Sequence, residues 1–449
     1  MAPGSRLRVE LGKPLHKVNG HESIFVHQND DLRALEITFN RTIKVPEDGT
    51  TYDLPPGLGN FPLYNVVHYG ENLPENISLK GGCFMPVYDR EALWISFKST
   101  KPFAIKVLIG GINAVSGEPI METFATRLRR SKLAQEKSSI QDYIVVDPAD
   151  QGQLWLDGIA KLNGKVMQFV AVPSGTGYSV EAQIAETESV GGIQIVITPI
   201  RAGPILYITV YQLGGKPTLS VMIDGNATVY ALMCSISQKN GTPISQMGIL
   251  FNNRRLEQNR LLSHYGICNG SFVNVVLNLC GGGVLQLIES NPVNAEMGVG
   301  AGGLIRQSIL SDPHASIAWD SDSTAIFNIQ LLNATIFESV TGRAPPPSPI
   351  TAESYAEAGL PFFALPKEAD SGIKGLFSDV KGIHEVDVEK GAAQPKPKFK
   401  YKGPSRGQGW KKELKFPTLQ LDKSGHLEGF RSVENITQEL NGWGITQFS

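Results

Sequence analysis

Short apolar runs separated by turn-forming residues dominate the first 200 residues of the chain. Runs that alternate or stay apolar over about five residues, bounded by Gly, Pro or Asp, are typical of short strands. Glu122–Lys137 breaks this pattern: it carries five Lys and Arg side chains and could form a single helix. The pattern predicts a β-rich domain over residues 35–203, preceded by a loose polar arm at 1–30. The predicted strands include Leu35–Phe39, Leu93–Phe97, Ala104–Ile109 and Gly192–Ile197.

A different pattern, from residue 205 to 283, predicts one helix that packs against a sheet. Thr228 suits the N-cap of this helix, because its hydroxyl can accept a hydrogen bond from a backbone N–H of the first turn. Gly241 suits the position after the helix, and Pro243 blocks its continuation. One helix clasped by a mixed sheet is the β-grasp fold. Its strands are predicted at Tyr207–Leu213 and Thr218–Ile223, which form a hairpin, and at Ile249–Phe251 and Phe272–Leu277.

The remaining residues differ in composition from both domains. We expect 284–390 to be an irregular region with short ordered islands, such as Ala325–Leu332. The Lys- and Pro-rich tract at 391–417 has too few apolar side chains to offset the entropy of ordering, which predicts a disordered linker. The final segment, 418–449, carries a predicted short helix at Val433–Leu440. The fold class is therefore α+β and multidomain, with a β-rich N-terminal domain, a central β-grasp domain and a partly disordered C-terminal region.

Composition narrows the classes of function. The 449 residues are 41% apolar and 19% charged, with a formal net charge of -2, which fits a soluble globular protein and gives no general attraction to nucleic acid or membranes. No apolar run reaches the roughly 18 residues of a membrane span, and no signal-like segment follows Met1. The four cysteines and eight histidines show no metal-ligand spacing. We expect no metal, no cofactor and a cytoplasmic protein with reduced thiols, the nucleus being the alternative compartment.

The order and spacing of residues from Thr228 to Gly283 resemble ubiquitin, from its helix to its diglycine tail. The resemblance implies a β-grasp fold and a patch on one face of the sheet that binds other proteins. The residues at the patch positions are Leu250, Asn274 and Val276, with Leu213 as a fourth on the first hairpin. The matching segments are Ile249-Leu250-Phe251, Leu256-Glu257, Leu262-Ser263-His264-Tyr265 and Gly281-Gly282-Gly283.

The glycine tail has two interpretations. Gly281–Gly283 could be the processing and conjugation tail of a modifier precursor, because an end without side chains can enter a narrow activating site. The two arginines that precede the diglycine of ubiquitin are replaced here by Asn278 and Cys280, and 166 residues follow Gly283. Of the lysines on which ubiquitin chains grow, only Lys239 is matched. A glycine linker that leaves a β-grasp domain is the favoured interpretation, and conjugation after cleavage is the alternative.

The rest of the chain resembles an uncharacterised family of fungal and bacterial proteins through Trp155–Gly158, Gln168–Pro173 and Gly177–Gln183. That family implies no chemistry. An enzyme, or a binder of a small ligand or glycan, in the N-terminal domain is therefore a further alternative based on its Trp, Tyr and Asp content. Cys83 is a candidate nucleophile between glycines and Phe84, with a buried structural thiol as the favoured interpretation.

Two further motifs have a structural interpretation. Ser174–Gly177 and Gly298–Gly303 lack the Gly-Lys-Ser/Thr of a phosphate-binding loop, so both are predicted to be turns. Seven lysines at 396–415, with aromatic residues between them, could contact RNA or an acidic partner, but a solvated linker is favoured. The leading hypothesis is a non-catalytic protein that binds other proteins through the sheet of its β-grasp domain, with no catalytic residue predicted.

Overall fold

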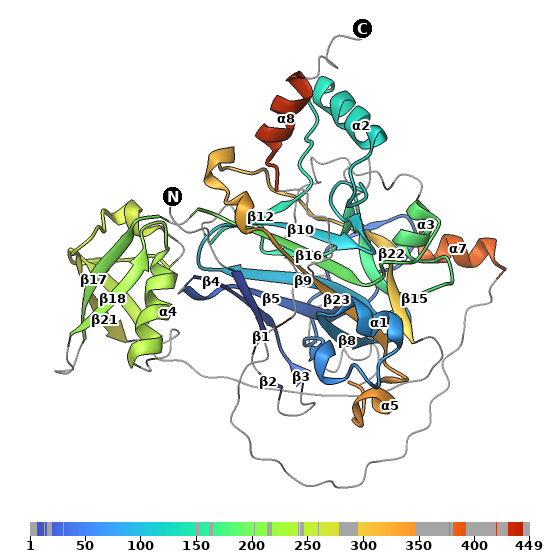
Figure 1. The fold of residues 1–449 in the computed structure, drawn as a ribbon, viewed down its shortest axis with the longest axis horizontal. Coiled ribbons are helices and arrows are strands. Elements are labelled where there is room, and N and C mark those ends of the chain that lie inside the picture. The colour runs from blue at the N-terminus through green and yellow to red at the C-terminus, as the bar shows by residue number, and fades with distance from the viewer. Residues whose placement is uncertain are drawn as a thin grey trace.

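The computed structural model describes most of the chain. The described residues are 7–12, 14–15, 20–29, 31–148, 152–160, 165–201, 203–212, 218–240, 242, 247–258, 260–277, 295–346, 377, 380–391, 419 and 430–442. Those outside 203–277 form one unit, here called the body, and residues 203–277 form a second, here called the β-grasp unit (Figure 1). In the described part, no helix is both long and apolar enough to cross a membrane.

The body is built on a 16-stranded sheet whose buried faces meet in one apolar core. In hydrogen-bonded order its main strands are β1 (Leu7–Leu11), β4 (Ile24–Gln28), β5 (Asp31–Thr42), β9 (Ala92–Ser99), β15 (Val166–Pro173), β22 (Glu296–Ile305), β23 (Ala325–Asn333), β16 (Ile193–Pro199), β10 (Phe103–Ile109) and β11 (Ile112–Asn113). The four predicted strands all lie within this set and are confirmed.

Shorter strands pair beside this path, and β2 and β3 pair only with each other. They are β2 (Pro14–Leu15), β3 (Gly20–His21), β6 (Thr51–Tyr52), β7 (Tyr64–Asn65), β8 (Cys83–Val87), β12 (Ile144–Val146), β13 (Trp155–Leu156) and β14 (Gly158–Ala160). The prediction of a loose arm at residues 1–30 is wrong for its described part. β1 and β4 are antiparallel partners, and apolar side chains such as Val9 and Ile24 are buried in the core.

The C-terminal half of the chain supplies two strands near the middle of the sheet. β22 pairs with β15, whereas β23 lies between β16 and β8 with all nine of its residues buried. The island predicted at Ala325–Leu332 is a strand. The boundary expected at residue 284 is corrected, because the segment after it completes the sheet of the body instead of forming an irregular region beside it.

The glycine run Gly298–Gly303 is part of β22, so its prediction as a turn is wrong. Glycine is required there because neighbouring atoms come too close for a side chain. A Cβ on Gly303 would lie 2.2 Å from the carbonyl oxygen of Pro46, and one on Gly302 would lie 2.6 Å from a methyl of Val170. Ser174–Gly177, in contrast, does form a turn after β15.

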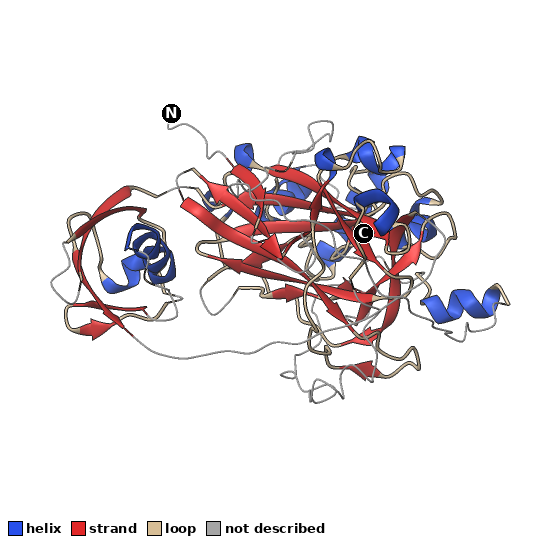
Figure 2. Cartoon of the chain, turned by 90° about the horizontal axis from the view of Figure 1, so that it is seen from below, coloured by secondary structure: helices blue, strands red, loops and turns tan. Residues whose placement is uncertain are grey.

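Helices cover the periphery of the body (Figure 2). They are α1 (Glu75–Lys80), α2 (Phe124–Gln135), α3 (Val180–Ala185), α5 (Phe337–Thr341), α7 (Ile383–Glu389) and α8 (Val433–Gly442), with short 3-10 turns at Val66–His68, Ser316–Ala318 and Ser321–Ser323. The predicted helices at Glu122–Lys137 and Val433–Leu440 are confirmed. α2 begins where the hydroxyl of Thr123 accepts a hydrogen bond from the backbone N–H of Thr126 at 3.2 Å.

The β-grasp unit has its own sheet and core. Its elements are β17 (Ile205–Tyr211), β18 (Leu219–Asp224), α4 (Val229–Asn240), β19 (Met247–Phe251), β20 (Arg254–Arg255), a 3-10 turn at Leu262–Tyr265 and β21 (Phe272–Leu277). The strand order is β18-β17-β21-β19-β20, with β17 and β21 parallel. The predicted N-cap is confirmed, because the Thr228 hydroxyl accepts from the N–H of Ala231 at 3.2 Å. Gly241 and Pro243 lie outside the described residues.

The body holds the β-grasp unit at the N-terminal end of α4. The Thr228 hydroxyl donates to the backbone oxygen of Thr100 at 2.8 Å, in addition to its capping role. Lys101 is buried at the same junction, with its Nζ 3.1 Å from a carboxylate oxygen of Asp31 and 3.9 Å from one of Asp224. A hydroxyl and an ammonium group are therefore among the contacts that link the two units.

One ion pair is among the contacts that hold α7 against the body, and it predicts a response to pH. Arg90 donates to both carboxylate oxygens of Asp387 at 2.6 and 2.7 Å, and these hydrogen bonds hold the pKa of Asp387 below its usual 3.8. A carboxyl whose pKa falls on folding stabilises the folded state above its ordinary pKa and loses this effect as the pH drops through the lower value. We expect α7 to stay protected from hydrogen exchange at pH 5–7 and to lose protection progressively as the pH falls below about 4 and through the lowered pKa.

Hydrogen exchange of Ile383–Glu389, corrected for intrinsic rates, measures this response. Asp387→Asn should remove the protection across the whole pH range. Glu389→Gln is the matched control, because Glu389 lies on the same helix but pairs with Lys381 at the surface. Equal protection of α7 at pH 3.5 and pH 6 would contradict the assignment.

Candidate functional site

The sheet of the β-grasp unit has a buried face and an exposed face. Alternate residues of β17, such as Ile208 and Val210, point into the core under α4. The residues between them point outward, because successive side chains of a strand lie on opposite faces. We call the exposed side the outer face, and its described members include Tyr207, Tyr211, Met222, Leu250, Phe272, Asn274 and Val276.

The outer face brings the predicted patch residues together. Leu250 is directly opposite Asn274 in the antiparallel pairing of β19 with β21, and Val276 is opposite Gly248 two residues further along. Leu250 and Val276 are half-buried and Asn274 is exposed. Leu213 and the tail Gly281–Gly283 lie outside the described residues. Leu250, Asn274 and Val276 thus form one continuous surface on two neighbouring strands.

Large apolar side chains extend this surface beyond the predicted patch. Tyr207, Tyr211, Met222 and Phe272 are between 45% and 57% exposed. The rings of Tyr211 and Phe272 stack with their centres 5.9 Å apart, and Tyr207 is directly opposite Met222. These four residues are not among the positions that the sequence predicts. The alternation in β17 could have indicated them, because Tyr207, Thr209 and Tyr211 alternate with the buried Ile208 and Val210.

The outer face points away from the body. α4 lies between the sheet and the body in both views, and the contacts of Thr228 with Thr100 are made from the helix side (Figures 1 and 2). Residues 205–277 contain five Lys and Arg residues and only two acids. One of the acids, Asp224, faces Lys101 at the junction, and the other, Glu257, faces Arg260. The outer face is therefore accessible and largely apolar at its centre, with the polar Asn274 and the basic Arg255 beside Leu250.

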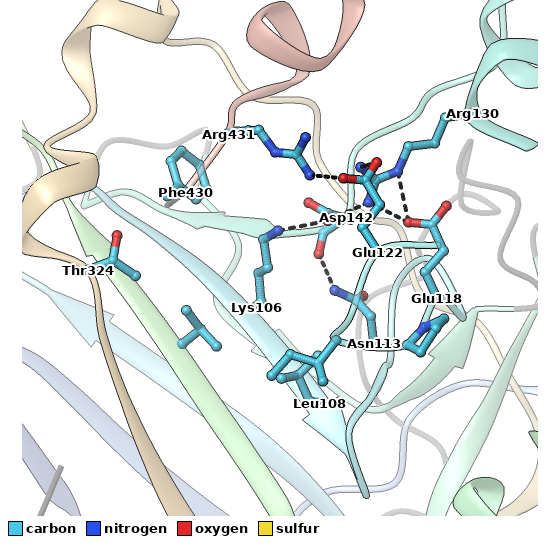
Figure 3. Close-up of a pocket in the computed structure, with 13 residues that line it drawn as sticks. Lys106, Leu108, Asn113, Glu118, Glu122, Arg130, Asp142, Thr324, Phe430 and Arg431 are labelled. Carbon is cyan, nitrogen blue, oxygen red and sulfur yellow. Dashed lines mark hydrogen bonds and ion pairs between the residues drawn. The ribbon is translucent and has the colours of Figure 1, made fainter. Parts of the chain in front are cut away.

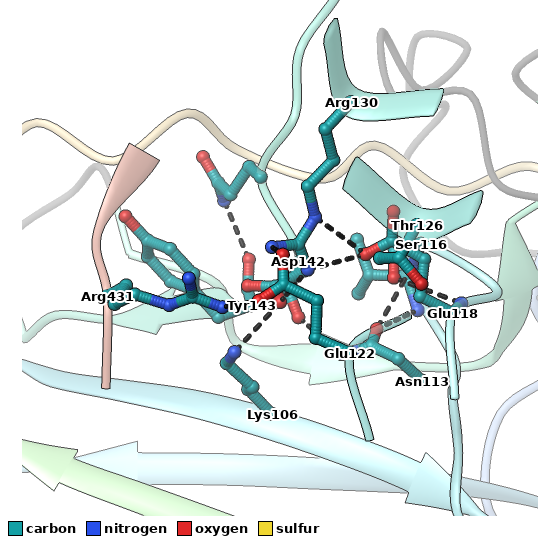
Figure 4. A network of polar contacts seen from close by, with 12 residues as sticks. Lys106, Asn113, Ser116, Glu118, Glu122, Thr126, Arg130, Asp142, Tyr143 and Arg431 are labelled. Atoms are coloured by element: carbon teal, nitrogen blue, oxygen red, sulfur yellow. Dashed lines mark hydrogen bonds and ion pairs between the residues drawn. The ribbon is translucent and has the colours of Figure 1, made fainter. Parts of the chain in front are cut away.

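A second candidate is a polar cavity of about 60 Å³ beside α2 in the body (Figure 3). Lys106 of β10 donates to an oxygen of Asp142 at 2.8 Å, and Arg130 of α2 contacts the same oxygen at 3.3 Å. Arg130 also donates to Glu118 at 2.6 and 3.0 Å. Figure 4 shows this network, in which Asn113 holds the backbone oxygen of Asp142 at 2.6 Å.

The C-terminal segment closes this cavity. Arg431, just before α8, donates to Glu122 at 2.7 Å, and Phe430 lines the cavity and packs against Tyr143. Burial raises the pKa of Glu122, but the hydrogen bond and charge of Arg431, with the charge of Arg130, outweigh burial and leave it below its usual value. Burial likewise opposes the charge of Arg130, whose pKa is nevertheless raised by its carboxylate partners. The cavity thus keeps both signs of charge.

The remaining candidates carry little chemistry. Cys83 is fully buried in β8, and burial raises the pKa of its thiol, which disfavours the nucleophilic thiolate. The described residues contain no group of three or more His, Cys, Asp and Glu placed to hold a metal ion. The basic tract at 396–415 lies outside the described residues.

Comparisons with known proteins concern the β-grasp unit. Residues 207–280 match the model of the ubiquitin family. Among solved structures, the ubiquitin of Caldiarchaeum subterraneum matches over 100% of its own chain and 18% of this one, with 21% sequence identity and a TM-score of 0.17. The family match does not extend to the segments between 155 and 183, whose resemblance stays a prediction. The segment that carries the outer face is a ubiquitin-like domain.

Proposed function

We propose that this is a non-catalytic interaction protein whose ubiquitin-like domain binds other proteins through the outer face. The observation that carries the proposal is a largely apolar surface on a sheet face that points away from the body. Exposed apolar patches of this kind, rimmed by polar residues, are typical of protein-binding sites. Aromatic residues and methionine are enriched at the centres of such sites, and both occur here.

The junction with the body supports the same function. Thr228 and Lys101 hold the unit by its helix side, so binding at the outer face requires no undocking. A rigid surface binds with less loss of conformational entropy than a flexible one. We propose that the body presents the ubiquitin-like domain to its partners. From the composition of the chain we also propose that the protein is cytoplasmic.

The alternative of a modifier precursor has less support. The chain enters the unit from β16 and leaves it toward β22, and both strands belong to the sheet of the body. Release of a small modifier would therefore need two cuts, and a single cut after Gly283 would separate β22 from the strands that precede it. The glycine segment fits better as a connection between the two units.

Leu250→Ala combined with Val276→Ala should reduce partner binding at least tenfold. Truncation of two central apolar side chains costs about 1–2 kcal/mol each where they are anchors, and about 1.4 kcal/mol corresponds to a factor of ten. Quantitative pull-down with equal amounts of folded protein measures the loss. The matched control is Leu79→Ala with Ile317→Ala, because both side chains are 79% exposed aliphatic groups on the body.

A second variant, Tyr211→Ser with Phe272→Ser, tests the aromatic part of the face. Loss of binding only in this variant would move the contact toward β17 while keeping the outer face as the site. Binding that is unchanged in both variants, or lost equally in the Leu79 and Ile317 control, would contradict the proposal.

A further inference from the structure

β1 is the end strand of the sheet of the body, so one of its two edges faces away from the other strands. The residue after it, Gly12, donates to the backbone oxygen of Ser23 at 2.7 Å and so continues the pairing of β1 with β4. Successive residues of an antiparallel strand direct their backbone groups to opposite sides. Counting back from Gly12, the N–H and carbonyl groups of Leu7, Val9 and Leu11 face the outer edge. Such an edge is a template for pairing with another extended chain.

Leu419, from the C-terminal part of the chain, occupies this edge. Its backbone N–H donates to the carbonyl oxygen of Val9 at 2.8 Å. Its side chain is only 2% exposed and belongs to the same apolar core as Val9 and Leu11. An extended peptide adds to a sheet edge in this way: hydrogen bonds of its main chain give affinity, and a pocket for a side chain gives specificity.

We propose that the outer edge of β1 is a docking site for an extended peptide that carries a leucine, and that Leu419 fills this site in cis. The site belongs to the body and is separate from the outer face of the ubiquitin-like domain. Its occupant offers a backbone N–H to Val9 and an aliphatic side chain of leucine size from the same residue, as Leu419 does. A partner with such a segment binds by displacing Leu419, so the chain limits access to its own site.

The contact of Leu419 is local, which makes it exchangeable. Its nearest described neighbours along the chain are Gly391 and Phe430, so this contact is separate in sequence from α7 and α8. Elements with few contacts open at a lower free energy than a strand paired on both sides, as β4 is between β1 and β5. A ligand on the same chain acts at an effective concentration on the order of 1 mM. A partner in trans therefore gains affinity when Leu419 is removed.

Fluorescence anisotropy with a labelled peptide of residues 414–424 tests the proposal on the full chain. The peptide should bind the Leu419→Asp variant at least tenfold more tightly than the unmodified chain, because a charged side chain leaves the apolar site and opens the edge. A peptide that carries the Leu419→Asp change should bind neither protein. Ile317→Asp is the matched control, because its side chain is 79% exposed on the body, and it should bind the peptide as the unmodified chain does.

Hydrogen exchange on the unmodified chain decides even if Leu419→Asp does not fold, which circular dichroism establishes. The N–H of Leu419 should exchange at least tenfold faster than those of β4, and a millimolar excess of the peptide should speed its exchange further by displacing the leucine.

Three results would overturn the proposal. The first is equal peptide affinity of the folded Leu419→Asp variant and the unmodified chain. The second is exchange of the Leu419 N–H that is as slow as in β4 or unaffected by the peptide, since Leu419 would then be a fixed part of the sheet. The third is a dimer of the unmodified chain in sedimentation that Leu419→Asp dissociates, because the occupant of the β1 edge would then be a second copy of this chain.

Discussion

A chain truncated after Gly283 is expected not to form the sheet of the body, although its β-grasp unit should keep its own core. The truncation removes β22 and β23, which pair with β15, β16 and β8. Each fully buried large apolar side chain contributes roughly 2 kcal/mol, so the loss of five amounts to about 10 kcal/mol, comparable to the whole stability of a typical domain. The five are Met297, Val299, Phe327, Ile329 and Leu331.

Near-UV circular dichroism and urea unfolding of the truncated chain measure this outcome. We expect one weak transition from the β-grasp unit and no cooperative transition from the body. A chain that ends at Gly442 is the control, because it retains all described strands. A truncated chain that unfolds cooperatively like the control would show that β22 and β23 are dispensable, and would restore support for a precursor processed at Gly281–Gly283.

Arg41→Met is expected to destabilise the protein by about 3–5 kcal/mol, since it leaves a buried carboxylate without its partner. Two nitrogens of Arg41 contact one oxygen of Glu91 at 2.5 and 2.6 Å, and the Glu91 side chain is completely buried. Burial raises the pKa of Glu91, and the charge of Arg41 opposes this rise. Without Arg41 the pKa of Glu91 rises further, so the folded state binds a proton more readily than the unfolded state.

The sign of the pH dependence follows from this difference. A carboxyl with a raised pKa in the folded state makes stability increase as the pH falls toward its ordinary value. The Arg41→Met variant should therefore recover part of its loss between pH 7.5 and pH 5. Urea unfolding at both pH values measures the recovery. Arg8→Met is the control, because the Arg8 side chain is 54% exposed and Glu10 keeps His27 as a second partner, and it should change the free energy of unfolding much less than Arg41→Met at either pH.

A double variant separates charge from packing. Arg41→Met with Glu91→Leu removes both charges and should be much less destabilised than Arg41→Met alone, because buried ion pairs often give no net stability over apolar replacements. If the single and double variants lose the same free energy and neither responds to pH, the loss comes from packing of the Arg41 stem, for example against Phe61.

The sequence predicted those elements whose stabilising contacts lie close together along the chain. The β-grasp unit completes its core within residues 205–277, so alternation, an N-cap and a known spacing were sufficient to predict it. The body was predicted only in part, because β22 pairs with a strand more than a hundred residues earlier. The glycine run of β22 was also predicted to be a turn. Glycine is necessary there because Pro46 lies close to Gly303, and this contact exists only in the folded structure.

The candidate sites follow the same division. Leu250, Asn274 and Val276 came from the resemblance, whereas Tyr207 and Phe272 were missed because sequence alone does not say which strand face stays uncovered. No local pattern in the sequence indicates the polar cavity. Its charged residues come from positions as distant as Lys106 and Arg431, and no spacing rule connects them.

The position of the β-grasp unit between β16 and β22 has a consequence for synthesis on the ribosome. β16 ends at Pro199, and its partner β23 begins only at Ala325, after 125 intervening residues. At about 5–20 residues per second, the nascent sheet waits roughly 6–25 s for the strand that covers the β16 edge. The ubiquitin-like domain folds within that interval, because its contacts are local. During this interval the nascent chain has an exposed edge on β16 next to an already folded ubiquitin-like domain. We expect chaperones to bind the chain in this state.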